Sequence, residues 1–145
     1  MAKITDIRVV NNVSGKDGGI FEGIVISTDP PDHYVHALIE SGCFCCEEYG
    51  FQICCNDQLM FDSSTDQKNH ENILKIFKGQ EIERVSFGSD RNDISVYYKQ
   101  SLTVNVFTKD LKKLSLILYN EHNGYYPHNT RVKWHGINED CTNEL

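Results

Sequence analysis

Hydrophobic and polar residues alternate along most of this chain with the period of two that is typical of half-buried β-strands. Leu102, Val104 and Val106 show the pattern most clearly, and β-branched and aromatic residues are frequent in the same windows. We expect strands over residues 4–10, 23–28, 33–40, 82–88, 94–98, 102–108, 114–119 and 130–134. Residues 11–19 are polar and rich in glycine, so they should form a turn after the first strand.

Prolines mark one hairpin. Asp29, Pro30, Pro31 and Asp32 separate the second and third expected strands. Proline cannot donate to a strand ladder, so these residues belong in the connection.

One segment has the pattern of a helix instead. We expect a helix over residues 70–78, where the apolar residues form one stripe: Ile73, Leu74, Ile76 and Phe77. Gly79 stands where such a helix is expected to end. We expect residues 56–69, which are mostly polar, to form a loop. The pattern therefore predicts a single α+β domain over residues 1–145, with a mainly antiparallel sheet and one or two short helices packed on one face.

Charge and composition narrow the classes of partner. The chain has a formal net charge of −7, and no window resembles a membrane span or a signal peptide. We therefore expect an intracellular protein. A negative chain repels a phosphate backbone unless a basic patch is concentrated on one face. The densest basic positions, 109–113 and the pair Arg131 and Lys133, resemble solvated strand faces, so nucleic-acid binding is disfavoured.

Six cysteines allow several interpretations: Cys43, Cys45, Cys46, Cys54, Cys55 and Cys141. An intracellular protein keeps thiols reduced, and free cysteines commonly fill core space as small apolar groups. A zinc site is the second possibility, with His36, His122 or His128 completing it. However, adjacent cysteines in a strand point to opposite faces, and the spacing is not that of a zinc knuckle. We therefore expect no metal and no cofactor, with Cys45 or Cys46 buried and no disulfide between Cys46 and Cys54.

A catalytic thiol is the third possibility. It needs a neighbouring cation or a helix N-terminus, together with a histidine base. Glu47 and Glu48 follow Cys46, and their negative charge raises the pKa of a neighbouring thiol.

The second distinctive segment is the turn at Asn123-Gly124, a strong hairpin signal. A two-residue turn there would pair His122 with Tyr125 and Leu118 with Asn129. That register sets the leucines of 114–119 on the same face as Arg131 and Lys133. Leucines and cations on one face are a costly mismatch, and a bulge near Pro127 would shift the register by one position and separate them. We expect an irregular hairpin end rich in asparagine, histidine and tyrosine.

The segments Cys45-Cys46-Glu47 and Asn123-Gly124-Tyr125-Tyr126 together resemble a family of small proteins of unknown function found in bacteria, phages and large DNA viruses. The resemblance runs from Gly23 to Trp134 and is strongest to versions carried by Marseillevirus-type giant viruses of amoebae. It implies an α+β domain of viral or phage-like origin, located in a host cytoplasm or a virion, and assigns no activity.

From these observations we expect a non-enzymatic binding or structural protein. The open edges of a sheet of short strands favour a homodimer. Because unpaired carboxylates are costly to bury, we expect Glu47 to lie near the loop 120–128. The expected ligand-binding residues are Glu47, Asn120, His122, Asn123 and Tyr125. The alternative is a thiol- or metal-dependent enzyme centred on Cys45, Cys46, Glu47 and His122.

Overall fold

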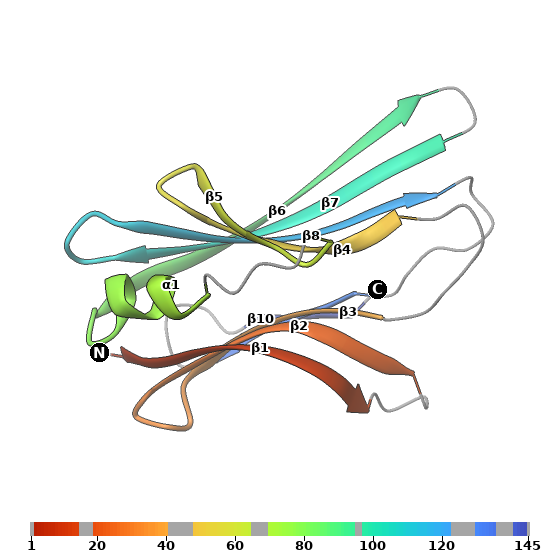
Figure 1. Ribbon diagram of the computed structural model, residues 1–145. Coiled ribbons are helices and arrows are strands. Elements are labelled where there is room, and N and C mark those ends of the chain that lie inside the picture. The colour runs from red at the N-terminus through yellow and green to blue at the C-terminus, as the bar shows by residue number, and fades with distance from the viewer. Residues whose placement is uncertain are drawn as a thin grey trace.

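A computed structural model describes residues 2–14, 19–40, 48–64, 70–94, 97–122, 130–135 and 141–144. In this part of the chain, strands form two five-stranded antiparallel sheets that pack face to face (Figure 1). The first sheet has the order β1-β2-β3-β9-β10, and the second has the order β5-β4-β8-β7-β6. The elements are β1 (Lys3–Ser14), β2 (Ile20–Asp29), β3 (Tyr34–Glu40), β4 (Glu48–Cys55), β5 (Gln58–Asp62), α1 (His70–Phe77), β6 (Ile82–Ile94), β7 (Tyr97–Thr108), β8 (Lys113–His122), β9 (Thr130–His135) and β10 (Cys141–Glu144).

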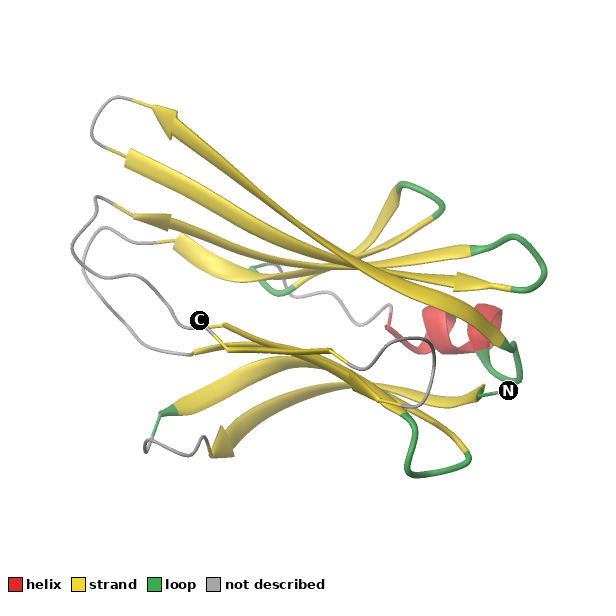
Figure 2. Ribbon diagram, turned by 180° about the vertical axis from the view of Figure 1, so that it is seen from behind, coloured by secondary structure: helices red, strands yellow, loops and turns green. Residues whose placement is uncertain are grey.

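The two halves of the chain are built on the same plan. Each half contributes a three-stranded meander to one sheet and an antiparallel pair of strands to the other. The chain passes from the first sheet to the second between β3 and β4, and it returns between β8 and β9. Both passages start and finish at the end of the sandwich away from α1 (Figure 2).

The core lies between the sheets and draws on alternate residues of both. Every second residue of β8 from Leu114 to Leu118 is buried, and the central strands of the first sheet supply the opposing residues. These opposing residues include Ile24, Ile26, Val35, Ala37, Ile39 and Val132, all with exposed fractions of 0%. The alternation predicted for 23–28 and 114–119 is therefore confirmed.

The helix closes one end of the sandwich. Ile73 and Phe77 of α1 are fully buried in the common core, and Gly79 ends the helix with a positive φ of 84°. The Gly79 amide donates to the Ile4 carbonyl (2.7 Å), and the Ile4 amide donates to the Gln80 carbonyl (2.9 Å). The predicted helix and its terminal glycine are confirmed, and their contact with β1 holds the first strand to the chain that enters β6.

The predicted α+β class is wrong. The described chain is essentially all-β, and α1 fills an end of the sandwich rather than covering a face. The physical reason is that a second sheet covers the inner face of the first. Two strands of that sheet were missed: β4 lies in the cysteine-rich segment, and β5 lies in the polar stretch predicted as a loop.

The predicted pairing of 114–119 with 130–134 is also wrong. β8 pairs with β4 and β7 in the second sheet, whereas β9 pairs with β3 and β10 in the first. The leucines of β8 therefore need no bulge to avoid the face of Arg131 and Lys133. Residues 123–129 lie outside the described residues, and they connect two sheets instead of closing a hairpin between β8 and β9.

Candidate binding site

The structure describes only part of the predicted ligand site. Glu47, Asn123 and Tyr125 lie outside the described residues, as do Cys45 and Cys46. His122 is the last residue of β8, where its backbone pairs with Tyr98, and its side chain is not described. The enzyme hypothesis, which depends on Cys45, Cys46, Glu47 and His122, therefore stays untested.

The strands that flank the two predicted segments do lie side by side. β4 begins at Glu48, which pairs with Glu121, and the next pair is Tyr49 with Asn120. The strand that follows Glu47 thus runs along the strand that leads to Asn123. The prediction that Glu47 itself lies near the loop 120–128 remains a prediction.

Asn120 is the one predicted site residue whose side chain is described. It shares the inner face of β8 with Leu116 and Leu118, and its exposed fraction is 4%. Neither amide atom has a hydrogen-bond partner among the described residues. Leaving a buried polar group unpaired costs about 1–3 kcal/mol, so buried polar groups in native proteins usually have a hydrogen-bond partner.

Thr130 is a second buried polar residue at the same end of the sandwich. It is the first residue of β9, pairs with Ile39, and is 8% exposed. Its hydroxyl also has no hydrogen-bond partner among the described residues. Asn120 and Thr130 make this end polar on the inner faces of both sheets.

The described cysteines behave as packing groups. Cys54 and Cys55 are free thiols in β4, and Cys55 belongs to the common core, whereas Cys54 is half-buried. Burial and then the neighbouring Cys54 raise the pKa of the Cys55 thiol to about 11. Burial also raises the pKa of the Cys54 thiol. Among the described residues, no group of three or more histidine, cysteine or acidic side chains is placed to hold a metal ion.

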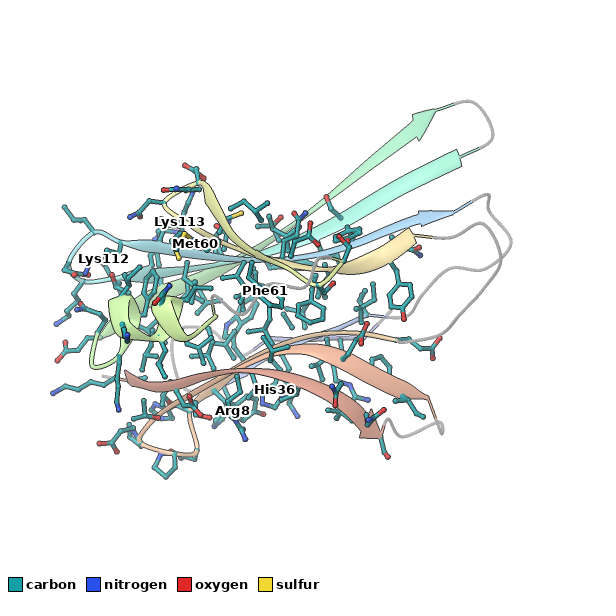
Figure 3. The ribbon with its side chains drawn as sticks, in the orientation of Figure 1. Arg8, His36, Met60, Phe61, Lys112 and Lys113 are labelled. Carbon is teal, nitrogen blue, oxygen red and sulfur yellow. The ribbon has the colours of Figure 1, made fainter. Side chains whose placement is uncertain are left out.

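A cationic surface lies on the outer face of the first sheet. The register sets Arg8 of β1 opposite Val25 of β2, Val25 opposite His36 of β3, and His36 opposite Lys133 of β9. Residues directly opposite one another point to the same face of a sheet. Figure 3 shows Arg8 and His36 together on the side of the first sheet that faces away from the second. We call the set Arg8, Tyr34, His36, Arg131 and Lys133 the cationic face.

Aromatic rings and cations alternate across this face. The ring centroids of Tyr34 and His36 are 4.7 Å apart, and Tyr34 also stacks on His135 at 6.0 Å. The Lys133 Nζ atom lies 5.7 Å from the centroid of the Tyr34 ring. The guanidinium of Arg131 lies 5.0 Å from the centroid of the Phe21 ring on the same face. These contacts hold the cations in place on a rigid sheet.

The pKa of His36 reflects the positive charges around it. Burial lowers the pKa of its imidazole, and the charges of Lys133, Arg131 and Arg8 lower it further. Among the described side chains, the charged groups that contribute to this shift are cations. Acidic residues lie on the same face: the Asp6 carboxylate is 3.5 Å from Arg8 at an exposed position, and the register sets Glu144 of β10 opposite Arg131.

A contrasting polar network lies on the outer face of the second sheet. The Asp62 carboxylate accepts hydrogen bonds from the Ser64 amide (3.0 Å), the Ser64 hydroxyl (2.9 Å) and the Gln52 amide (3.0 Å). The Tyr119 hydroxyl donates to it at 3.3 Å. Burial alone would raise the pKa of the Asp62 carboxyl, but these hydrogen bonds hold it below its ordinary value. The acid is satisfied within the chain, so its role is structural.

Sequence reasoning missed the cationic face although it noted three of its members, His36 as a possible zinc ligand and Arg131 and Lys133 as basic positions. The spacings Tyr34-x-His36 and Arg131-x-Lys133 place each pair on one side of a strand. The pairing of β3 with β9 brings the two pairs together, and the pairing of β3 with β2 and of β2 with β1 adds Arg8. The alternation of residues along each strand does not predict this strand order.

No family model, curated protein or solved structure matches this chain, so the family resemblance stays an expectation. Within the described residues, no helix is both long enough and apolar enough to cross a membrane.

Proposed function

We propose that this protein is a non-enzymatic binding protein that holds an anionic ligand on the cationic face. A single observation carries the proposal: Arg8, His36 and Lys133 occupy one row across four strands, and the charges of Lys133, Arg131 and Arg8 act together on His36. An origin in a large DNA virus is part of the proposal and is supported by the sequence resemblance alone.

The chemistry of the face fits a phosphate or carboxylate group. The Lys133 ammonium and the Arg8 and Arg131 guanidiniums donate charge-assisted hydrogen bonds, which are about twice as strong as neutral ones. His36 adds a donor and a positive charge when it is protonated. An anion bound beside it would favour that protonation.

The net charge of −7 limits the size of the ligand. At a distance, the summed field of the chain repels a long polyanion, whereas close to the sheet the local cations dominate. A single phosphate or a short acidic segment therefore fits the face better than a nucleic acid does.

The test uses three probes at low ionic strength: inorganic phosphate, a short glutamate peptide and an oligothymidylate. Calorimetric titration should show saturable binding of phosphate or of the peptide, and the stronger probe identifies the source of the anion. Lys133→Glu should weaken that binding about tenfold or more, because a charge-assisted contact contributes about 1.5–3 kcal/mol.

Lys113→Glu is the matched control. It makes the same change of charge on the second sheet, where the Lys113 Nζ atom lies 2.6 Å from Asp57. Its affinity for the probe should equal that of the wild type. Equal weakening in both variants, or no binding of any probe, would contradict the proposal.

A further inference from the structure

The aromatic rings of the cationic face form one continuous group. The Tyr34 ring lies 4.7 Å from the His36 ring, at an angle of 34° between their planes, and 6.0 Å from the His135 ring, at an angle of 29°. Tyr34 and His36 are half-buried, so part of each side chain is in contact with solvent. Aromatic rings with exposed surface stack with other planar groups, including nucleobases. The face can therefore hold a ligand that has a planar ring as well as a negative charge.

The register divides this face into rows, and one of them collects cations. The His36 row contains, from β1 to β10, Arg8, Val25, His36, Lys133 and Thr142. None of these residues is acidic, whereas in a neighbouring row Glu144 stands opposite Arg131. Figure 3 shows Arg8 and His36 on the same outer side of the sheet. The His36 row is therefore the best place on this face for a phosphate group.

The row on the other side of His36 has a different character. The Tyr34 row contains Asp6, Ser27, Tyr34 and His135. The Asp6 carboxylate repels a phosphate but can accept hydrogen bonds from hydroxyl and amino groups, and the Ser27 hydroxyl can donate or accept. The rings of Tyr34 and His135 stand in the same row as these polar groups. This row therefore fits a neutral planar group with polar edges and not a second anion.

The spacing of the two rows matches a ligand of this kind. Tyr34 and His36 are two residues apart in β3, so their rows are separated by about 6.6 Å along the strand. In a nucleotide, one ribose joins the phosphate to the base and bridges a separation of this size. A nucleoside monophosphate can therefore reach both rows at once.

We propose that the ligand of the cationic face is a nucleoside monophosphate, with its phosphate in the His36 row and its base stacked on the rings of the Tyr34 row. This inference rests on the proposed function, because it requires an anion on this face, and it names the chemical class of that anion. Phosphotyrosine also joins a ring to a phosphate, but its ring is a hydrocarbon and offers no polar edge to Ser27 or Asp6. A longer nucleic acid is disfavoured by the net charge of −7.

The test is a calorimetric titration of the full-length protein at low ionic strength with four probes: adenosine monophosphate, ribose 5-phosphate, inorganic phosphate and phosphotyrosine. Adenosine monophosphate should bind about fivefold or more tightly than ribose 5-phosphate, because stacking of the base adds to the affinity. It should also bind more tightly than phosphotyrosine. In the wild-type complex, nuclear Overhauser contacts should join the adenine protons to the ring protons of Tyr34.

Variants of Tyr34 separate the base from the phosphate. Tyr34→Leu should lower the affinity for adenosine monophosphate to within about twofold of that for ribose 5-phosphate, which itself should not change, because the variant loses the ring and keeps the cations. Tyr34→Phe keeps the ring and should keep the preference. Phe107→Leu is the matched control, since it removes a ring that lies 3.8 Å from the guanidinium of Arg84 on the second sheet, and it should bind all probes as the wild type does.

The outcomes distinguish this inference from the proposed function. If phosphate and ribose 5-phosphate bind, and adenosine monophosphate binds no more tightly than they do, the inference is overturned and the proposed function stands. If no probe binds, both are overturned. Tighter binding of phosphotyrosine, equal loss of affinity in Tyr34→Leu and Phe107→Leu, or adenine contacts that do not include Tyr34 would also overturn the inference. The Overhauser measurement uses the wild type, so it decides the position of the base even if Tyr34→Leu does not fold.

Discussion

The outer faces of the two sheets carry polar groups with different surroundings. On the second sheet, Asp62 receives hydrogen bonds from Ser64, Gln52 and Tyr119, all within one chain. On the first sheet, His36 lies among Arg8, Arg131 and Lys133, and the charges of these three cations lower its pKa. The polar groups of the second sheet thus stabilise the fold, whereas the cations of the first sheet oppose the protonation of His36. The comparison shows that the role of a polar side chain on a sheet face depends on which residues lie next to it, more than on the overall composition of that face.

The largest effect should come from breaking the support of the cationic face. Gly23 of β2 stands opposite Leu38, and a Cβ atom there would overlap the carbonyl oxygen of Ala37 and lie 2.9 Å from the Leu38 Cα atom. Because both contacts are with backbone, no side chain can move aside. Gly23→Ala should therefore lower the free energy of unfolding by about 3 kcal/mol, measured by urea denaturation.

Gly88→Ala is the matched control for Gly23→Ala. Gly88→Ala places its Cβ atom in open space and should stay within about 0.5 kcal/mol of the wild type. If Gly23→Ala were equally neutral, the close approach of β2 and β3 would be wrong.

A smaller effect should follow from removing the acid of the second sheet. Asp62→Ala leaves donors of Gln52, Ser64 and Tyr119 without their acceptor, so the free energy of unfolding should fall by about 2 kcal/mol. Binding on the cationic face should not change, because that face lies on the other sheet.

The same residue predicts a pH dependence. The pKa of Asp62 is lower in the folded chain than in the unfolded one, so the folded state binds fewer protons. Its stabilisation is complete above the unfolded pKa of about 4 and is lost as the pH falls through the lower folded value. Asp62→Asn should remove this contribution from an acid titration of stability. A variant with the acid dependence of the wild type would contradict the role given to Asp62.

Much of the strand content could be predicted from the sequence, because half-buried strands reveal themselves by alternation. β2, β3, β7 and β8 follow this pattern closely, and α1 has both a helical stripe and a terminal glycine. The strand β4 was missed because Phe51, Ile53 and Cys55 alternate with half-buried residues inside a run of cysteines that suggested metal chemistry instead. The short strand β5 was missed because its residues are mostly polar or exposed.

The order of the strands could not be predicted in the same way. The turn signal at Asn123-Gly124 suggested a hairpin, but β8 and β9 belong to different sheets. Local alternation fixes which side chains share a face and leaves open which strand lies next to it. For the same reason, Asn120 could be proposed as a site residue from the polar segment that contains it. The row of Arg8, His36 and Lys133 could be recognised only once the strand order of the first sheet was known.

The most direct test of the cationic face is the pKa of His36, measured by an NMR titration of its imidazole. The described titratable and charged groups on its face include Tyr34 from β3, Arg8 and Asp6 from β1, and Arg131 and Lys133 from β9. The pKa of His36 should lie below the ordinary value of 6.5, Lys133→Gln should raise it, and a bound anion should raise it as well. The folded state then binds fewer protons than the unfolded state, so the stability due to His36 falls as the pH drops below about 6.5. A His36 pKa at or above 6.5 that does not respond to Lys133→Gln would contradict the account.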